Sequence, residues 1–448
     1  MTAIVSAPNG TEPGQVTPVP AKHSLNMWSV AAMGIGSMVG AGIFALLGQV
    51  AITAGGQTWL AFAAGGLIAL LSGYSYARLA ARYPSSQGVL AFFNEGMPSR
   101  TAAGAMSLIY VVTLAVGVAL VAKAFGAYGA RLVLGDGADP FWSVTLAIGI
   151  VVLLTFVNIV STAAVGRAEV ILVAIKLTIL LALMVAGLKS INLGMLESGP
   201  PVSPLAVTGS VGITFFAYAG YGMMANASGD VADPKRTIPR AIFLAIGVVI
   251  VLYIGLSLVV LGNVTPENLL KYSDTAVAEA AQPVLGRVGF VLVSISALLA
   301  TASAINAVIF AFINITRGLS DEHQLPAWFS RPLVGNASVG LLGSVAGILA
   351  LVAFFSLGAV ANIVSATFLI TYLAVFVVNW RLRRETASQS WVIALGFALM
   401  LAVLAVFLWT VAGSQPAALA AIVIFSLGCF VAEWLIQRTQ PHEAPASA

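Results

Sequence analysis

Residues 34–44 read GIGSMVGAGIF, and four of the first nine positions are glycine. Glycine in a helix interior costs about 1 kcal/mol relative to alanine, so this cluster predicts an interrupted helix. A second cluster, FFAYAGYG, occupies residues 215–222. Non-helical backbone at membrane depth is tolerated where it lines a cavity or is buried in protein. Close helix packing is the alternative, because Gly36 and Gly40 form a small-xxx-small pair, but the second interruption favours a site.

Both clusters lie in a chain that is too apolar to be a soluble domain. Of its 448 residues, 60% are hydrophobic and 8% are charged, whereas a soluble domain has about 25% charged residues. A membrane-spanning helix needs about 20 apolar residues, and windows of that length predict twelve spans. These cover residues 27–50, 57–82, 102–130, 141–162, 168–188, 205–229, 238–262, 285–314, 339–357, 360–380, 391–412 and 417–437.

The two glycine clusters fall in the first and sixth predicted spans. An offset of five spans, which is an odd number, turns the second copy upside down in the membrane. Broken helices at corresponding positions of two inverted repeats are typical of secondary transporters, whose substrate site lies at the breaks. We therefore predict an all-α polytopic membrane protein with a 5+5 inverted repeat, discontinuous spans 1 and 6, and two further spans.

The loops predict the orientation of the chain. Lys and Arg residues concentrate in the loops on the side of the N-terminus, and cytoplasmic loops are enriched in them. Both termini are therefore expected in the cytoplasm, and the protein in the plasma membrane. The net charge of +4 follows from this bias, so no nucleic-acid partner is expected. The expected segments are a disordered tail (1–24), a transporter domain (25–440) with repeats at about 27–190 and 203–384 and extra spans at 391–437, and a second tail (441–448).

A single lysine, Lys176, interrupts the apolar run VILVAIKLTILLALMVAGL at residues 170–188. A charged side chain at the bilayer centre costs about 2.5–3.5 kcal/mol on insertion scales, so such a residue is a functional-site hypothesis. Burial disfavours the charged form of lysine, which would let Lys176 take up a proton on one side and release it on the other. The alternative is a lysine that extends to the membrane surface, and this describes Lys123 in the third span better.

Other function classes lack the residues they need. An intramembrane enzyme requires positioned carboxylates, histidines or an activated nucleophile, and we place no such group in mid-span. Cys429 is the single cysteine, so no thiol metal site is expected. A channel would need rings of carbonyls or charges from repeated subunits, and a polyamine pocket would need carboxylates. Exchange of two substrates stays open, as do a polyamine or cationic amino acid as substrate, the oligomeric state, and any small membrane subunit or lipid ligand.

Several stretches resemble the amino acid–polyamine–organocation (APC) superfamily of transporters. The first span resembles the motif G-x-x-x-G-x-G-I-F, and VGRAEVILVAIKL is most similar to the proton-coupled, broad-specificity amino-acid transporters. The chain departs from the wider family at Arg78 and at residues 228–230, where glutamates are frequent in relatives. The other matching stretches are YARLAARYPSSQG (76–88), ANASGDVADPKRTIPRAI (225–242) and TASAINAVIFAFINITRGLSDEHQLP (301–326).

This resemblance implies a LeuT-like fold with an amino acid as substrate. Free amides and carbonyls at broken helices bind the carboxylate and the ammonium in such folds. Phe216 and Tyr218 are implied as gating aromatics, although Tyr218 also fits ordinary packing. The residue-by-residue match places the carboxylate at the backbone of Gly40, Ala41 and Gly42, and the ammonium at carbonyls near Met38, Phe216 and Ala219.

The resemblance also implies how transport is driven. Lys176 occupies the place of a sodium ion in sodium-coupled relatives. Thr301 and Ser303 match sodium ligands there, and their hydroxyls could accept hydrogen bonds from the lysine amine. Small neighbours of Phe216 indicate a compact pocket. The hypothesis is proton-coupled symport of small or medium neutral amino acids by alternating access, with protons as the coupling ion and no cofactor.

Overall fold

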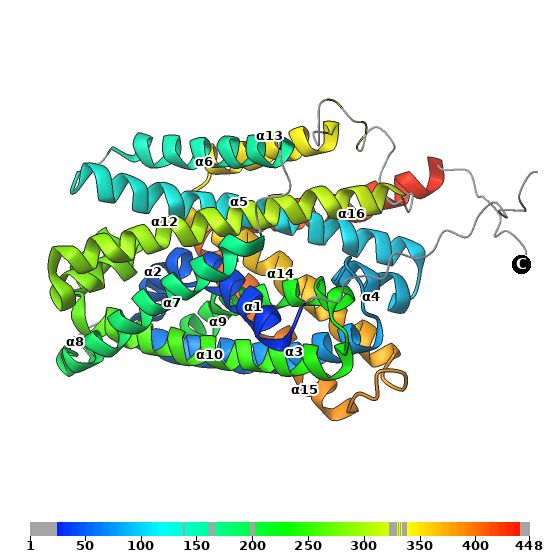
Figure 1. Cartoon of the computed structure of the whole chain (residues 1–448), viewed down its shortest axis with the longest axis horizontal. Helices are drawn as coiled ribbons and strands as arrows, with labels where there is room; N and C mark the ends of the chain where they lie inside the picture. Colours follow the sequence, from blue (N-terminus) through cyan, green and yellow to red (C-terminus); the bar gives the residue numbers. More distant parts are fainter. Residues whose placement is uncertain are drawn as a thin grey trace, which may run out of the picture.

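The computed structural model describes residues 25–137, 139–160, 166–197, 202–321 and 338–439, together with Phe329, Arg331 and Leu333. The tails predicted at 1–24 and 441–448 lie outside these residues. The described part of the chain is built from helices and contains no strand. Most of the long helices run side by side along the longest axis of the molecule, as Figure 1 shows.

The helices begin and end where the sequence provides caps. Ser99, Ser203 and Ser356 each accept a hydrogen bond from the backbone N–H three residues later, which satisfies one open donor of a helix start. The helices of the first half are α1 (Met27–Ala41), α2 (Ile43–Ala54), η1 (Gly55–Gln57), α3 (Thr58–Arg82), α4 (Val89–Gly96), α5 (Arg100–Leu134), α6 (Pro140–Val160), α7 (Gly166–Lys189) and α8 (Leu193–Glu197).

The second half continues in the same way. The loop before residue 285 holds a short helix, α11. The predicted eighth span is part of a longer helix, α12, which kinks at Gly286, where φ is 67°. These helices are α9 (Pro204–Tyr218), η2 (Ala219–Ala225), η3 (Ser228–Asp230), α10 (Pro234–Asn263), α11 (Pro266–Lys271), η4 (Ser273–Thr275), α12 (Ala276–Asp321), α13 (Val339–Phe354), α14 (Leu357–Arg381), α15 (Ser390–Ser414) and α16 (Pro416–Thr439).

Nine helical segments of the described residues are long and apolar enough to cross a membrane. One of them, Ile43–Arg82, joins α2 and α3 through η1, and Met27–Gly40 and Val339–Phe354 are shorter apolar helices. The protein is thus a multi-pass membrane protein. The twelve-span arrangement and the inverted repeat stay predictions, because helix length and composition alone do not define them.

The helices of the bundle differ in how much of their surface is buried. Helices α5 and α14 are the most buried of the long helices, whereas α6, α7 and α16 expose most of their residues. At the edge, α6 and α13 lie against each other, and α3 and α10 pack together on the opposite side of the view in Figure 1. Exposed apolar side chains such as Phe141 and Phe156 on α6 are expected where a helix faces lipid.

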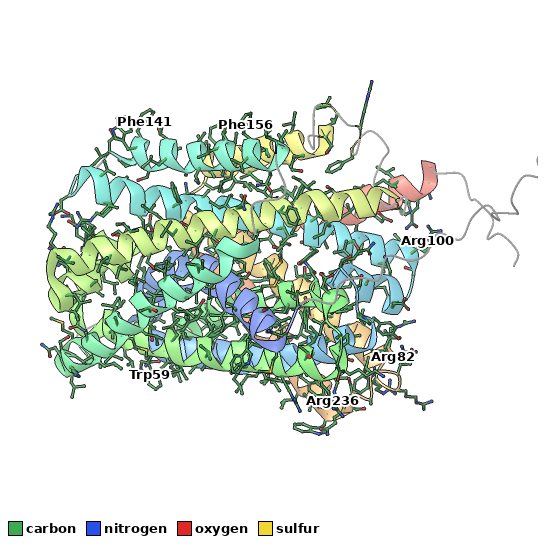
Figure 2. All side chains as sticks on the ribbon, viewed as in Figure 1. Trp59, Arg82, Arg100, Phe141, Phe156 and Arg236 are labelled. Carbon is green, nitrogen blue, oxygen red and sulfur yellow. The ribbon has the colours of Figure 1, made fainter. Side chains whose placement is uncertain are left out.

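Charged side chains gather at the two ends of the bundle. Figure 2 shows Arg82 and Arg100 near the end where α16 finishes, with Arg236 in the same half of the molecule. These three arginines lie at the end of the second predicted span and in the loops that follow the second and sixth, which the sequence analysis expects on the side of the N-terminus. Trp59 and Phe141 lie in the other half.

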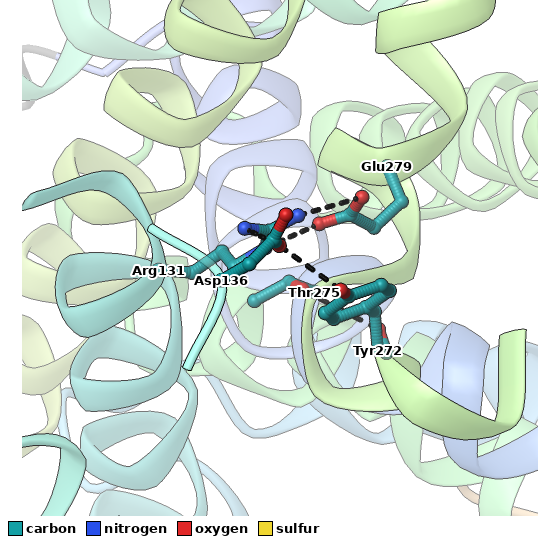
Figure 3. A network of polar contacts seen from close by, with 5 residues as sticks. All are labelled: Arg131, Asp136, Tyr272, Thr275 and Glu279. Carbon is teal, nitrogen blue, oxygen red and sulfur yellow. Dashed lines mark hydrogen bonds and ion pairs between the residues drawn. The ribbon is translucent and has the colours of Figure 1, made fainter. Parts of the chain in front are cut away.

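An ion-pair network ties α5 to the start of α12 at the other end of the bundle (Figure 3). The Arg131 guanidinium donates to both Glu279 carboxylate oxygens, with Nε 2.7 Å from Oε1 and Nη2 3.2 Å from Oε2. It also pairs with Asp136, and its central carbon lies 4.4 Å from the centre of the Tyr272 ring. The Tyr272 hydroxyl donates to Asp136 Oδ1 at 2.9 Å. These contacts connect the end of α5 with α12 and with the segment that precedes α12.

Removal of the arginine from this network is expected to destabilise the protein. The Arg131 and Glu279 side chains are 14% and 10% exposed, and loss of one partner of a largely buried pair costs on the order of 3 kcal/mol. Arg131→Ala should therefore lower the midpoint of thermal unfolding in detergent. Arg287→Ala, at an exposed position on α12, is the control and should unfold like the parent. An unchanged midpoint for Arg131→Ala would show that the network contributes nothing to stability.

Candidate functional site

The two predicted helix interruptions lie against each other. Helix α1 ends at Ala41 and α2 begins at Ile43, whereas α9 ends at Tyr218 and continues as the 3₁₀ segment η2. The seven residues of η2 exceed the usual length of a 3₁₀ run. The interruptions predicted at residues 34–44 and 215–222 are thus both present.

Glycines at the two breaks permit backbone-to-backbone contact. A Cβ atom at Gly220 would lie 2.6 Å from the Met38 amide nitrogen, and one at Gly42 would lie 2.6 Å from the Ala217 carbonyl oxygen. Carbon atoms do not approach backbone this closely, so any side chain at either position would force the spans apart. By contrast, a Cβ atom at Gly40 would face Ala300 of α12, at 2.9 Å from its carbonyl oxygen. Gly40 therefore serves helix packing in this arrangement.

A tyrosine that the sequence analysis missed joins the two breaks. The Tyr253 hydroxyl of α10 lies 2.7 Å from the Met38 carbonyl oxygen and 3.2 Å from the Ala217 carbonyl oxygen. Met38 O also accepts from the Gly42 amide at 2.8 Å, so both of its lone pairs are engaged. Met38 could bind a substrate ammonium, as predicted, only after one of these donors withdraws. The Ala219 carbonyl is engaged in the same way, by the Tyr372 hydroxyl at 2.5 Å.

A cavity of about 50 Å³ lies beside the breaks. Phe216 and Ala219, two of the predicted substrate-binding residues, line it, whereas Met38, Gly40 and Gly42 do not. Its polar side chains are Ser37 and Tyr110, and no lining residue in the described part of the chain carries a charge. The lining residues are Ser37, Tyr110, Leu114, Gly117, Val118, Val121, Phe216, Ala217, Ala219, Gly220, Met223, Ala304, Ile305, Val308 and Phe368.

The two aromatics predicted to gate have different surroundings. The Phe216 ring lies at the cavity against Phe368 of α14, with 5.0 Å between ring centres. Tyr218 is fully buried, donates its hydroxyl proton to the Phe62 carbonyl at 3.0 Å and packs against Tyr253. Tyr218 therefore has the contacts of a core residue, whereas Phe216 lies at the cavity wall, and its role as a gate stays a prediction.

The lysine of the apolar run contacts the first span. Lys176, on α7, is 2% exposed, and its Nζ donates to the Gly36 carbonyl oxygen at 2.8 Å. Gly36 directly precedes Ser37, which lines the cavity. The Lys176 amine therefore contacts the backbone directly before the cavity.

The other polar residues predicted near Lys176 lie on α12. The Thr301 hydroxyl is buried and donates to the Ala297 carbonyl oxygen of its own helix at 2.7 Å. Ser303 is half-buried on the same helix. Their predicted role as hydrogen-bond acceptors for the amine stays a prediction.

The extension of Lys123 to the membrane surface stays a prediction. The Lys123 ammonium of α5 donates to the Val352 carbonyl oxygen at 2.9 Å. Val352 lies in the last turn of α13, where helix carbonyls have no partner within the helix and attract cations. The end of α13 therefore provides a hydrogen-bond acceptor for the Lys123 ammonium.

These features together define a polytopic membrane transporter, with helix breaks that meet beside a small cavity. The chain belongs to the amino acid permease family, within the APC superfamily, and the family profile matches residues 25–431. The resemblance found in the sequence motifs is thereby confirmed.

Relatives with curated names carry the same class of function. The chain is 47% identical over 386 residues to the inner membrane transport protein YbaT of Escherichia coli. The matched region covers 86% of this chain and 90% of that protein. It is 26% identical to cationic amino acid transporter 9, chloroplastic, of Arabidopsis thaliana, over 68% of this chain and 57% of that protein. It is 25% identical to the methylthioribose transporter of Bacillus subtilis, over 80% of this chain and 81% of that protein. The names of these relatives include more than one kind of substrate, so family membership alone does not define the substrate of this chain.

Proposed function

We propose that this protein is a proton-coupled symporter that carries small or medium neutral amino acids by alternating access. The observation that carries the proposal is the hydrogen bond from the buried Lys176 amine to the Gly36 carbonyl, one residue before the cavity-lining Ser37. A titratable group in this position links proton uptake to the geometry of the first span. Protons are the coupling ion in this proposal, and no cofactor takes part.

The coupling follows from the strength of that hydrogen bond. Protonated Lys176 holds the Gly36 carbonyl firmly and fixes α1 against η2, where Gly220 contacts the backbone of Ser37 and Met38. Loss of the proton weakens the bond and allows α1 to move away from the cavity. Substrate that binds the closed form therefore favours the protonated lysine, and the two ligands travel together.

The composition of the cavity supports a neutral substrate. A cationic amino acid or a polyamine has a distal ammonium that needs a carboxylate when it is buried, and the described lining residues offer none. In this proposal the substrate carboxylate binds amides in the first turn of α2, where a helix start leaves donors without an intrahelical partner. The ammonium binds carbonyls such as those of Phe216 and Ala219, once donors such as the Tyr372 hydroxyl withdraw.

We also propose the finer architecture. Twelve spans would form two five-span inverted repeats at about residues 27–190 and 203–384, with two further spans and with both termini in the cytoplasm. Two observations support this: the interruptions at Gly42 and Ala219 fall five predicted spans apart, and Arg82 and Arg100 lie near the same end of the bundle. Cysteines introduced at residues 2 and 446 should react with a membrane-impermeant maleimide only after the membrane is opened.

The energy of the proton gradient suffices for this function. One charge that crosses 100 mV releases about 2.3 kcal/mol, and about 1.4 kcal/mol corresponds to a tenfold concentration ratio. Symport of one proton with a neutral amino acid therefore supports roughly 50-fold accumulation.

Two measurements test the proposal. Thermal unfolding of the purified protein should be screened against the twenty amino acids, because a ligand at 100 times its dissociation constant stabilises by about 2.7 kcal/mol. Vesicles that contain the protein should then accumulate the best ligand when the outside is acidic. An exchanger would instead show counterflow that does not depend on the pH gradient. Stabilisation by lysine, arginine or a polyamine alone would contradict the neutral-substrate proposal.

Because Phe216 and Tyr218 have different surroundings, substitutions at the two positions should have different effects on transport and stability. Phe216→Ala removes a ring from the cavity wall and should reduce transport at least tenfold while the protein still folds. Tyr218→Phe removes only a hydroxyl that donates to the Phe62 carbonyl, which should cost about 1 kcal/mol of stability and leave substrate affinity unchanged. Initial uptake rates and thermal unfolding of both variants give the comparison. Loss of transport in Tyr218→Phe with full activity in Phe216→Ala would reverse the two roles.

A further inference from the structure

We propose that Gly117 of α5 sets the largest side chain that the cavity accepts, and thus determines which neutral amino acids are carried. The inference rests on the proposed function, since it concerns the part of the same cavity that takes the substrate side chain. It follows from the α5 face that lines the cavity, from the free space beside Gly117, and from the position of the polar groups.

One face of α5 forms a wall of the cavity. Its lining residues are Tyr110, Leu114, Gly117, Val118 and Val121, and this spacing places them on one side of a helix. Gly117 alone among them has no side chain. At this position the cavity therefore extends to the backbone of α5.

Gly117 differs from the other glycines of α5 in its surroundings. A Cβ atom at Gly117 would meet a single atom within 4 Å, Val364 Cγ2, at an ordinary contact distance of 3.8 Å. A Cβ atom at Gly104 would collide with the Glu433 carboxylate, and one at Gly126 with the Ser143 carbonyl oxygen. Those two glycines permit helices to approach closely. Packing does not require a glycine at position 117. The effect of this glycine is therefore to enlarge the cavity.

The position of the polar groups directs a substrate side chain towards this wall. The helix breaks line the cavity through Ser37, Ala217 and Gly220, whose small or absent side chains leave the backbone close to the cavity. The walls formed by α5, α12 and α14 contribute side chains, and these are apolar except for Tyr110. A substrate whose ammonium and carboxylate contact the breaks therefore directs its side chain to the apolar walls, where Gly117 provides the missing volume.

An added methyl group at this position should act as a selective block. One methylene group in a hydrophobic pocket changes discrimination by about 10- to 200-fold. Gly117→Ala should therefore weaken binding of the largest accepted side chain at least tenfold, and leave the affinity for glycine and alanine within about twofold. Gly117→Val should extend the block to the next smaller side chain. Alanine in a helix interior is favoured over glycine, so the alanine variant is expected to fold.

The test is a comparison of affinity ratios in the purified full-length protein. Dissociation constants for glycine, alanine, valine and leucine are measured by ligand-induced thermal shift, and competition for uptake into vesicles gives a second readout. Gly149→Ala on α6 is the matched control, because a Cβ atom there has nothing within 4 Å and position 149 does not line the cavity. The quantity compared is the dissociation constant for leucine, or for the largest ligand of the parent, divided by the dissociation constant for glycine. This ratio should rise at least tenfold in Gly117→Ala and stay constant in Gly149→Ala.

Two results would overturn the inference. The first would reject only the role of Gly117, and the second would also reject the proposed function. If the parent binds and carries neutral amino acids but Gly117→Ala keeps the parental ratio, Gly117 does not determine specificity and the proposed function stands. If neither the parent nor the control binds any of the four amino acids, the proposed function fails, and the role of Gly117 fails with it.

Discussion

Lys176→Gln is expected to abolish accumulation driven by a proton gradient while exchange of substrate across the membrane continues. In the parent, one proton per substrate supports up to about 50-fold accumulation at 100 mV, and the ratio in the variant should fall to about 1. The reason is that Lys176 is buried and donates to the Gly36 carbonyl beside the cavity. Glutamine retains an N–H donor for that carbonyl but cannot take up a proton in this range.

Two further substitutions separate titration from packing. Lys176→Met keeps a similar volume but leaves the buried Gly36 carbonyl without its lysine donor, which should cost about 1–3 kcal/mol of stability in addition to the loss of coupling. Lys176→Arg keeps the charge, yet a guanidinium stays protonated, so arginine should not restore coupling.

The measurement uses vesicles that contain equal amounts of each variant. Labelled amino acid uptake is followed with an inward proton gradient, with an uncoupler, and under counterflow without a gradient. The parent should lose accumulation when the uncoupler is added, and the glutamine variant should show counterflow alone. Accumulation in Lys176→Gln equal to that of the parent would exclude this lysine as the coupling group.

Gly42→Ala should eliminate substrate binding, and this is the second large effect. The added Cβ atom would lie 2.6 Å from the Ala217 carbonyl oxygen and 2.7 Å from the Met38 carbonyl oxygen, and it would also collide with the Tyr253 hydroxyl. The carbonyl atoms belong to the backbone of the two breaks and cannot turn away as a flexible side chain can. The breaks must therefore separate, at a cost of about 1–3 kcal/mol for such overpacking, and the cavity beside them changes shape.

A double variant tests which contact matters. Tyr253→Phe removes the hydroxyl from the contact but not the two carbonyl oxygens, so Gly42→Ala/Tyr253→Phe should regain part of the stability and little of the binding. Gly149→Ala is again the control for the added methyl group. Thermal shift with the best ligand reports both quantities. Binding by Gly42→Ala with the affinity of the parent would show that the break at Gly42 is not part of the substrate site.

The sequence predicted the membrane class and both interruptions because their signals are local. Glycine clusters at residues 34–44 and 215–222 weaken a helix wherever it packs, and the structure interrupts both spans there. Lys176 is conspicuous in an apolar run, and it is buried, as its position in the run indicates. Family membership was also evident from the motifs, and it is confirmed by the match over residues 25–431.

The roles of individual side chains were harder to predict. The hydroxyl of Tyr253 meets carbonyls that are 215 and 36 residues away in sequence, and a tyrosine within an apolar span gives no sign of such partners. The sequence favoured Phe216 over Tyr218 as the gating residue, but only the structure shows that the first lines the cavity and the second lies in the core.

The sequence by itself thus determined that this chain spans membranes, that its helices break at the two glycine clusters, and that Lys176 is buried. Composition, glycine clusters and an isolated charge fix these properties, because they act through the local cost of helical backbone and of charge in hydrocarbon. Only the tertiary structure decided that Tyr253 joins the two breaks, that Gly36 is a partner of Lys176, and that Gly117 opens the wall of the cavity. Each of these depends on which faces of distant helices meet, and that is set by the packing of the whole bundle.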